Sequence, residues 1–213
     1  MKLRKRLLLN TRLYLIVCIE GNSQQGIIYT RAQKALKAGI KILQLRCKTA
    51  NDNLFLKLAW QYRILTKKNN ALFIINDRVD IAHYCGADGV HLGQDNLPLG
   101  YARKTLGPNK IYGKSTHSLK QARQAQLEGA DYIGFGPIFQ TQTKPWAKAI
   151  GSSNIKSLVK NIKIPFFAIG GINKNNIGKI ISAGAERVAI SNAILSKENT
   201  TCAVKSLERA FQQ

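Results

Sequence analysis

The stretch EGADYIGFG, residues 128–136, shows in nine residues the unit that decides the fold. It ends a helical pattern with a glycine, where a left-handed cap is favoured, and continues as a short apolar run rich in strand formers. Related phrases end helical patterns elsewhere in the chain: KAGI at 37–40, CGAD at 85–88 and SAGAE at 182–186. These phrases indicate a repeated helix–glycine–strand unit.

Eight apolar runs have this strand character: residues 12–18, 40–46, 71–76, 87–92, 110–115, 131–136, 164–170 and 187–191. Amphipathic stretches lie between them, such as 118–129, which opens with Ser118 as an N-cap. Eight strand–helix units without a long linker predict an α/β fold, a (β/α)₈ TIM barrel, as a single domain over residues 1–213. A doubly wound open sheet uses the same local units. The barrel is favoured because polar residues follow nearly every strand, at the face where barrel enzymes place their sites.

The composition is strongly basic, with a formal net charge of +22 from 33 Lys and Arg against 11 Asp and Glu. A basic surface attracts phosphates, so nucleic acid is one partner to consider. However, no nucleic-acid motif is visible and no basic run alternates with stacking aromatics. We therefore interpret the charge as a solvated surface and do not expect nucleic acid as a partner.

The four cysteines, Cys18, Cys47, Cys85 and Cys202, include no C-x-x-C pair, so we expect neither a zinc site nor a disulfide framework. Reduced thiols fit a cytoplasmic protein. The basic and apolar N-terminus resembles a signal peptide, but residues 10–12 interrupt its apolar run and no small-residue cleavage site follows. No segment has the length of a membrane span, so we expect no membrane partner. A homo-oligomer is compatible with the pattern.

Three polar residues alternate at the end of the second strand: Gln44, Arg46 and Lys48. Alternate residues of a strand point to the same side of the sheet. Burying two cationic side chains in a barrel mouth is costly unless an anion meets them. This spacing therefore favours an anion site over two solvated charges.

Oxygen-bearing side chains follow the third and fourth strands. Asp77, directly after Asn76, could bind a hard cation or cap the next helix, and the motif alone favours the cap. Asp95 and Asn96 precede a helix start predicted near Pro98 and carry the same two alternatives.

Two further polar residues stand at strand ends, His91 at the end of the fourth strand and Ser115 at the end of the fifth. His91 could be a catalytic base, although a hydrogen-bonded packing role is more common for a lone histidine. No activated base for Ser115 is evident, so we interpret it as a hydrogen-bonding residue rather than a nucleophile.

The loop after the sixth strand, GFGPIFQTQTKPWAKAIG at 134–151, is long for a compact barrel, which indicates a functional loop. Its glycines allow a ligand to approach the backbone, Thr141 and Thr143 provide hydroxyls, and Lys144 provides a mobile positive charge.

The loops after the last two strands contain the pair Gly170–Gly171, ahead of a helix expected near Asn173, and the turn Ser191–Asn192. In barrels these two loops commonly form a phosphate site from backbone N–H groups and helix N-termini. Together with the cationic strand end, the chain therefore presents two anion sites. Two such sites would suit an enzyme that joins two phosphorylated small molecules.

In this order and spacing, the strand-end segments resemble those of thiamine-phosphate synthase (thiamine-phosphate pyrophosphorylase). The similarity runs nearly end to end and includes QLRCK, NDR, ADGVHLGQDNLP, STHS, GADYIGFGPIFQTQTK and IPFFAIGGI. It implies a transferase that joins a hydroxymethylpyrimidine diphosphate to a (carboxy)thiazole phosphate, giving thiamine phosphate and pyrophosphate. In that family the pyrimidine's C–O bond breaks first, and the thiazole nitrogen then attacks the resulting carbocation.

The resemblance also implies a role for each site residue. The diphosphate would be held by Arg46, Lys48, Asn76, Ser115 and Lys144, of which Arg46, Ser115 and Lys144 would act in catalysis. Gln44 would orient the pyrimidine. The thiazole phosphate would be held by Thr141, Thr143, Gly171, Ser191 and Asn192. One Mg²⁺ ion would be held by Asp77 and Asn96.

The chain departs from the family pattern at two positions. Cys47 stands where the family usually has glutamate, and Asn96 stands where it commonly has a second Mg²⁺-binding aspartate. An amide oxygen in place of a carboxylate predicts weaker binding of Mg²⁺.

Two rival functions differ from the synthase in particular residues. A thiazole tautomerase of the same superfamily would carry a catalytic histidine in the turn after the sixth strand, where this chain has Pro137. A barrel that has lost catalysis and binds nucleic acid is compatible with Cys47 and Asn96. The intact Thr-x-Thr-Lys loop and the glycine pair favour the synthase.

Overall fold

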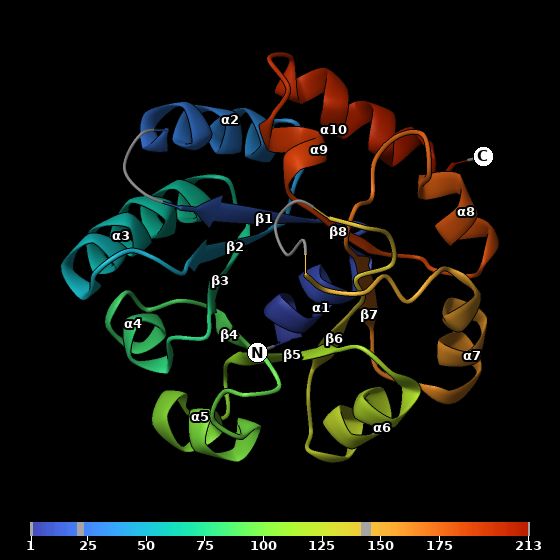
Figure 1. The fold of residues 1–213 in the computed structure, drawn as a ribbon. Coiled ribbons are helices and arrows are strands. Elements are labelled where there is room, and N and C mark those ends of the chain that lie inside the picture. Colours follow the sequence, from blue (N-terminus) through green and yellow to red (C-terminus); the bar gives the residue numbers. More distant parts are fainter. Residues whose placement is uncertain (1, 21–23, 142–145, 213) are drawn as a thin grey trace.

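Eight parallel strands form one closed barrel and follow each other around it in chain order, so that β8 pairs with β1 (Figure 1). The structure is a computed structural model and describes residues 2–20, 24–141 and 146–212. The strands are β1 (Leu13–Ile19), β2 (Ile42–Cys47), β3 (Leu72–Asn76), β4 (Gly89–Leu92), β5 (Ile111–Thr116), β6 (Tyr132–Phe135), β7 (Phe166–Ile169) and β8 (Val188–Ile190). The predicted barrel is confirmed, and the open sheet is wrong because an open sheet has two unpaired edges.

Helices cover the outside of the barrel (Figure 1). They are α2 (Gln25–Lys37), α3 (Asp52–Lys68), α4 (Val79–Tyr84), α5 (Leu99–Leu106), α6 (Leu119–Leu127), α7 (Ser153–Asn161), α8 (Ile177–Ser182), α9 (Asn192–Leu195) and α10 (Thr200–Arg209). Ser118 caps α6 as predicted, because its side chain accepts a hydrogen bond of 3.2 Å from the Gln121 N–H. The glycines of the four repeated phrases, Gly39, Gly86, Gly129 and Gly184, all have positive φ, which confirms their role in ending helices.

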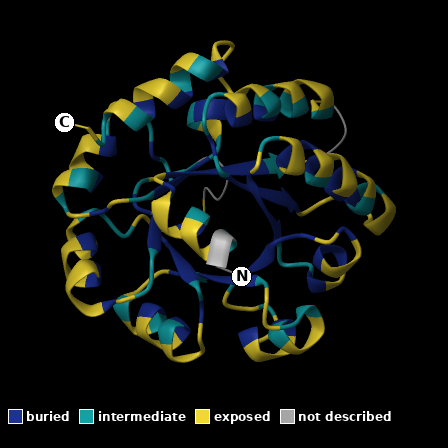
Figure 2. Cartoon of the chain, turned by 180° about the vertical axis from the view of Figure 1, so that it is seen from behind, coloured by how far each residue is buried: buried dark blue, intermediate teal, exposed yellow. Residues whose placement is uncertain are grey.

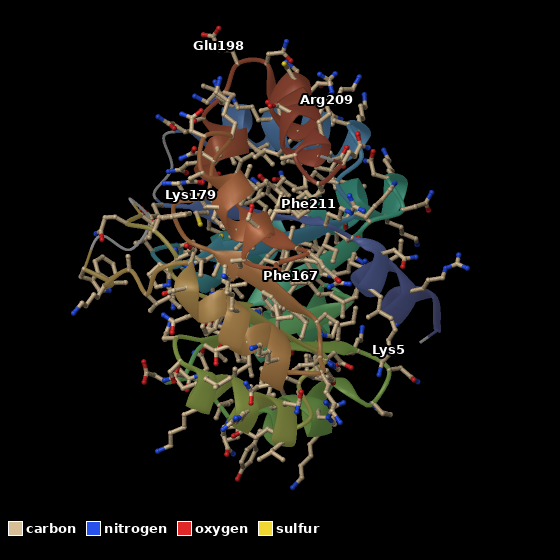
Figure 3. All side chains as sticks on the ribbon, turned by 90° about the vertical axis from the view of Figure 1, so that its right-hand side faces the viewer. Lys5, Phe167, Lys179, Glu198, Arg209 and Phe211 are labelled. Atoms are coloured by element: carbon tan, nitrogen blue, oxygen red, sulfur yellow. The ribbon has the colours of Figure 1, made fainter. Side chains whose placement is uncertain are left out.

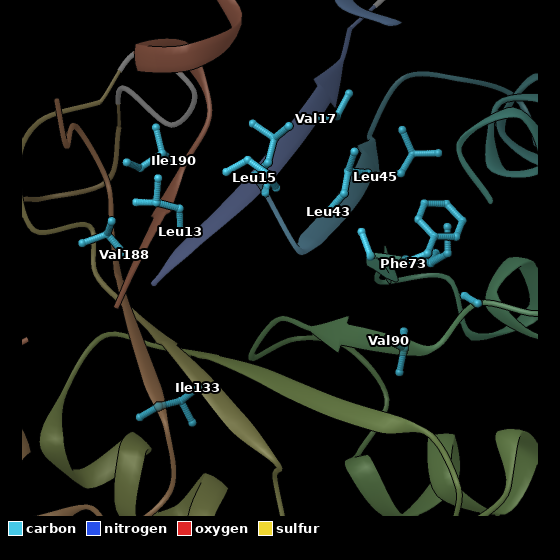
Figure 4. Close-up of a cluster of buried hydrophobic side chains, with 14 of the residues drawn as sticks. Leu13, Leu15, Val17, Leu43, Leu45, Phe73, Val90, Ile133, Val188 and Ile190 are labelled. Carbon is cyan, nitrogen blue, oxygen red and sulfur yellow. The ribbon is translucent and has the colours of Figure 1, made fainter. Parts of the chain in front are cut away.

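Successive strand residues alternate between two buried layers. Outward side chains such as Leu15, Leu43 and Phe73 pack between the strands and the helices (Figure 4). Inward side chains, among them Tyr14 and Phe167, fill the barrel interior. The parity of each strand position therefore decides whether a side chain lies in the outer layer or faces the interior and the mouth.

The N-terminal helix α1 (Lys2–Asn10) was not predicted from the sequence, and it lies across the centre of the ring when the barrel is seen from behind (Figure 2). Leu8 of α1 is buried and packs with the inward side chains. Arg4 forms an ion pair of 2.8 Å with Asp88, just before β4, and Lys5 forms one of 3.1 Å with Asp131, just before β6. The helix thus closes the N-terminal end of the barrel and leaves the carboxyl ends of the strands accessible.

A side view shows Lys5 at the end of the molecule that α1 occupies, with Phe167 near the middle (Figure 3). None of the described helices combines the length and the apolar composition needed to cross a bilayer.

We predict that Leu8→Ala lowers the free energy of unfolding by about 2–4 kcal/mol, because it deletes a buried side chain from the closed end of the barrel. Its neighbour Leu9 is half exposed, so Leu9→Ala should change stability by less than about 0.5 kcal/mol. Urea unfolding followed by circular dichroism measures both variants. Equal effects from the two substitutions would contradict the proposed packing of α1.

Candidate active site

A cavity of about 880 Å³ opens at the carboxyl ends of the strands, the end opposite α1. This volume lies in the range of small-molecule sites. Eight of the predicted site residues line it: Gln44, Arg46, Asn76, Ser115, Thr141, Gly171, Ser191 and Asn192. The structure therefore brings together residues that lie up to 148 positions apart in the chain, from Gln44 to Asn192.

A smaller hollow of about 170 Å³ adjoins this cavity. The predicted residues that line it are Arg46, Lys48, Asn76, Asp77, Asn96 and Ser115. Arg46, Asn76, Ser115 and His117 line both spaces, so the two form one continuous mouth. The predicted residues Thr143 and Lys144 lie outside the described residues.

The side chains of β2 alternate between the barrel interior and the outer layer, which explains why the end of this strand contributes to the mouth. Gln44 and Arg46 are buried and face inward, where Arg46 forms an ion pair of 3.5 Å with the exposed Glu20. Cys47 points the other way and packs with the outer layer that faces α3. Its burial raises the pKa of the Cys47 thiol to about 12, so the thiol stays protonated and unreactive. The departure from the family pattern at Cys47 is therefore outside the site.

Asp77 does not cap the following helix, so the favoured capping interpretation is wrong. Arg78 stands at the N-cap position of α4 and makes no side-chain capping bond. The Asp77 backbone has a φ of 64°, a left-handed conformation in which its carboxylate pairs with the Lys48 ammonium. This ion pair links the ends of β2 and β3 at the edge of the smaller hollow.

Asn96 and Asp95 do not cap the next helix either, because the N-cap position of α5 is Pro98. The Asn96 Oδ1 instead accepts a hydrogen bond of 2.5 Å from the Gly93 N–H. Within the described part of the chain, no cluster of three His, Cys, Asp or Glu side chains could hold a metal ion. The oxygens of Asp77 and Asn96 would fit a Mg²⁺ ion only if further ligands came from outside the protein, as substrate phosphates do in many magnesium sites.

The predicted phosphate turns lie side by side along the large cavity. A Cβ at Gly171 would lie 2.3 Å from the Gln140 carbonyl oxygen, and φ there is +63°, so this position requires glycine. The Gly171 carbonyl accepts a hydrogen bond of 2.9 Å from the Asn176 amide, which fixes the turn. α8 begins at Ile177, later than the start expected near Asn173, because Asn173–Asn176 form turns instead. α9 begins directly after Ser191, as expected.

Beneath the mouth lies a chain of buried polar side chains, of which Gln44, His91 and Ser115 were singled out from the sequence and Tyr14 and Tyr132 were not. The Gln44 Nε2 donates to the Tyr14 hydroxyl at 2.7 Å, and the Tyr14 hydroxyl lies 2.8 Å from that of Tyr132. The Tyr132 hydroxyl lies 3.1 Å from His91 Nδ1, and His91 Nε2 lies 2.9 Å from Ser115 Oγ. His91 is thus a hydrogen-bonded residue of the interior. In the sequence the two tyrosines look like ordinary strand residues. Only their position in the alternation of each strand, which directs them inward, could have identified them as part of the site.

Two more residues of the mouth were not predicted. His117 lines both spaces, and its Nδ1–H donates to the Gly136 carbonyl. Cys18 lines the large cavity, with its Sγ 4.0 Å from an Arg46 nitrogen. Burial raises the pKa of the Cys18 thiol above its ordinary value.

Comparison with known proteins connects this geometry to a family. The family model described as thiamine monophosphate synthase matches residues 13–194. A thiamine-phosphate synthase of a Nostoc species is 42% identical over 204 residues, which cover 96% of this chain and 57% of that protein. A Prochlorococcus marinus thiamine-phosphate synthase is 46% identical over 173 residues, which cover 81% of this chain and 50% of that protein. The chain thus spans little more than half the length of these curated relatives.

A solved structure covers nearly the whole of both chains. It is the thiamine phosphate pyrophosphorylase of Pyrococcus furiosus, which is 33% identical, with a TM-score of 0.85 and coverage of 99% of this chain and 98% of that one.

Proposed function

The chain belongs to the thiamine monophosphate synthase family, and on this premise we propose that it joins a hydroxymethylpyrimidine diphosphate to a (carboxy)thiazole phosphate. The products are thiamine phosphate and pyrophosphate. The observation that carries the proposal is the continuous mouth, in which a cationic strand end and a glycine-rich phosphate turn line adjoining spaces. Two anionic substrates would bind there with their reacting ends facing each other.

The smaller hollow is the proposed diphosphate site. Arg46 and Lys48 bring two positive charges, and Asn76 and Ser115 bring hydrogen-bonding groups. Lys144 is assigned to the same site by its place in the Thr-x-Thr-Lys loop. In the large cavity, Gln44 would orient the pyrimidine from the floor.

The phosphate turns are the proposed site of the thiazole phosphate. Gly171, Ser191 and Asn192 line the large cavity there, and Thr141 approaches from the loop after β6. Thr143 is assigned to the same site by sequence. Backbone N–H groups in such turns bind phosphate well because they present several donors to one anion.

The reaction transfers one electron pair in each of two steps. The C–O bond between the pyrimidine methylene and the diphosphate breaks, and its electron pair leaves with the diphosphate oxygen. The lone pair of the thiazole nitrogen then forms the new C–N bond to the methylene carbon. Arg46, Lys48 and Lys144 would stabilise the negative charge that develops on the leaving oxygen, and apolar lining residues such as Ile169 would keep water from the carbocation.

Mg²⁺ is part of the proposal, with Asp77 and Asn96 as the protein ligands. When bound, the ion would neutralise charge on the diphosphate. The ion pair between Asp77 and Lys48 supports coupled binding of Mg²⁺ and the diphosphate. Lys48 can turn fully to the diphosphate only if another cation replaces it at Asp77.

The proposed function is tested by incubating the protein with both substrates and Mg²⁺. One pyrophosphate should appear for each thiamine phosphate, and neither substrate should release pyrophosphate alone. A coupled pyrophosphate assay and chromatography of the thiamine phosphate measure the two products. Absence of both products, together with salt-dependent retention on nucleic acid, would instead support the polyanion-binding barrel.

Removing a charge-stabilising donor should slow this reaction strongly. We predict that Arg46→Ala and Lys144→Ala each reduce kcat by a few hundredfold, since such a donor contributes about 3 kcal/mol to stabilising the transition state. Lys148 is an exposed lysine of the same loop and serves as the matched control, because Lys148→Ala should leave kcat within about twofold. Normal turnover by either test variant would refute the role assigned to that residue.

The amide at Asn96 predicts a high requirement for Mg²⁺. We expect Asn96→Asp to lower the Mg²⁺ concentration at half-maximal activity by about tenfold, or about 1.4 kcal/mol, because it adds a negative charge and keeps an oxygen acceptor for Gly93. Asn109→Asp is the control, since Asn109 is exposed next to α1 at the opposite end of the barrel. Titration of activity with Mg²⁺ measures all three proteins. Saturation of the unchanged protein at micromolar Mg²⁺ would overturn the prediction.

A further inference from the structure

The buried chain of side chains beneath the mouth runs from Gln44 on β2 through Tyr14, Tyr132 and His91 to Ser115 on β5. Four of its five members are at most 7% exposed, and Ser115 is half-buried at the end of the chain. It therefore joins the residue proposed to orient the pyrimidine to a residue proposed to hold the diphosphate. The roles of its members depend on which way the hydrogen bonds point.

The hydrogen bonds of the chain can be given one direction in which each tyrosine hydrogen has an acceptor. An amide nitrogen can only donate, so the Tyr14 oxygen accepts from Gln44 Nε2. Among the described residues the other partner of this hydroxyl is Tyr132, so the Tyr14 hydrogen finds its acceptor there. The Tyr132 hydrogen is then left for His91 Nδ1. A neutral histidine whose Nδ1 accepts must carry its hydrogen on Nε2, which then donates to Ser115 Oγ.

Both tyrosines keep their hydrogens in this environment. Burial raises the pKa of Tyr14 and of Tyr132 above the ordinary value for a phenol. Each hydroxyl can therefore donate one hydrogen bond while it accepts another, as the direction of the chain requires.

A glycine on β5 provides the space in which Tyr132 and His91 meet. A Cβ at Gly113 would lie 2.2 Å from the Tyr132 ring and 2.5 Å from His91 Nδ1, the two groups that meet there. Any larger residue would push the ring of Tyr132 away from His91. The barrel thus has room for this contact only because β5 carries no side chain at that position.

From this geometry we propose that His91 is a positioning residue, held as the Nε2–H tautomer by Tyr132, which makes Ser115 a hydrogen-bond donor to the diphosphate. Because Ser115 Oγ accepts from His91, its own hydrogen is directed to the cavity. In the opposite tautomer, His91 would take that hydrogen and Ser115 would turn oxygen lone pairs toward an anion. The role at the diphosphate rests on the proposed function, whereas the tautomer is a property of the free protein.

The first test measures the tautomer of His91. In protein labelled with ¹⁵N-histidine, His91 should show an unprotonated Nδ1 and a protonated Nε2, and its signals are assigned by their loss in His91→Gln. Tyr132→Phe removes the donor to Nδ1 and should change the tautomer. Tyr14→Phe leaves that donor in place and should retain it. A protonated Nδ1 with an unprotonated Nε2 in the unchanged protein would overturn the proposal.

The second test uses pyrophosphate as the ligand, measured by calorimetry. Ser115→Ala and Tyr132→Phe should each weaken its binding by about 10- to 100-fold, as expected for a lost hydrogen bond to a charged group. Tyr14→Phe is the matched control, because it deletes the neighbouring hydroxyl of the same pair, and it should stay within about threefold. Equal binding by Tyr132→Phe and the unchanged protein would overturn the proposal.

The two tests separate failure of this inference from failure of the proposed function. If the protein forms no thiamine phosphate but the tautomer and the pyrophosphate affinities follow the expected pattern, His91 positions Ser115 for an anion in another reaction. If thiamine phosphate forms and Tyr132→Phe changes neither the tautomer nor the affinity, the proposed function stands and the positioning role is wrong.

Discussion

The mouth depends on the pairing of β8 with β1. That pairing joins Leu13 to Val188 and Leu15 to Ile190, and it turns a twisted parallel sheet into a closed barrel. Closure brings the carboxyl ends of all eight strands to one rim, so Arg46 near the chain's beginning lines the same cavity as Ser191 near its end. An open sheet would leave β1 and β8 as separate edges, and no common space would connect the two predicted anion sites.

Closure also makes strand parity decisive, because every second residue enters a single small interior. The interior holds bulky rings from β1, β6 and β7, namely Tyr14, Tyr132 and Phe167, and these rings pack edge to face. Glycines such as Gly113 provide the room for them. The same rule of parity places Arg46 in the mouth and Cys47 in the outer layer. Adjacent positions of one strand thus differ completely in function, and the substitution at Cys47 is compatible with an intact site.

Local patterns made most of the fold predictable from the sequence. The eight strands and the glycines that end helices depend on short-range periodicity and backbone preference, and both are visible in a phrase such as EGADYIGFG. The helix α1 was not predicted because its apolar residues follow a cluster of basic ones and its partners, such as Asp88, lie far away in the sequence. The site residues on strand ends were predictable for the same reason as the strands. Side-chain contacts between the ends of neighbouring strands were not predictable in this way. That Asp77 pairs with Lys48 rather than capping α4 depends on the register between β2 and β3.

The charges at the mouth are arranged to discriminate between anions rather than to attract any anion. Arg46 lies beside Glu20, and Lys48 is paired with Asp77, so neither cation faces the cavity without a counter-charge. An entering diphosphate gains only the difference between its own contacts and those that it replaces. A single phosphate with poor geometry would gain little. The proposed diphosphate would replace both carboxylate contacts, with another cation taking the place of Lys48 at Asp77, and would also accept from Ser115. The net charge of +22 can attract many anions to the surface, and under the proposed function these internal pairs would let the site distinguish among them.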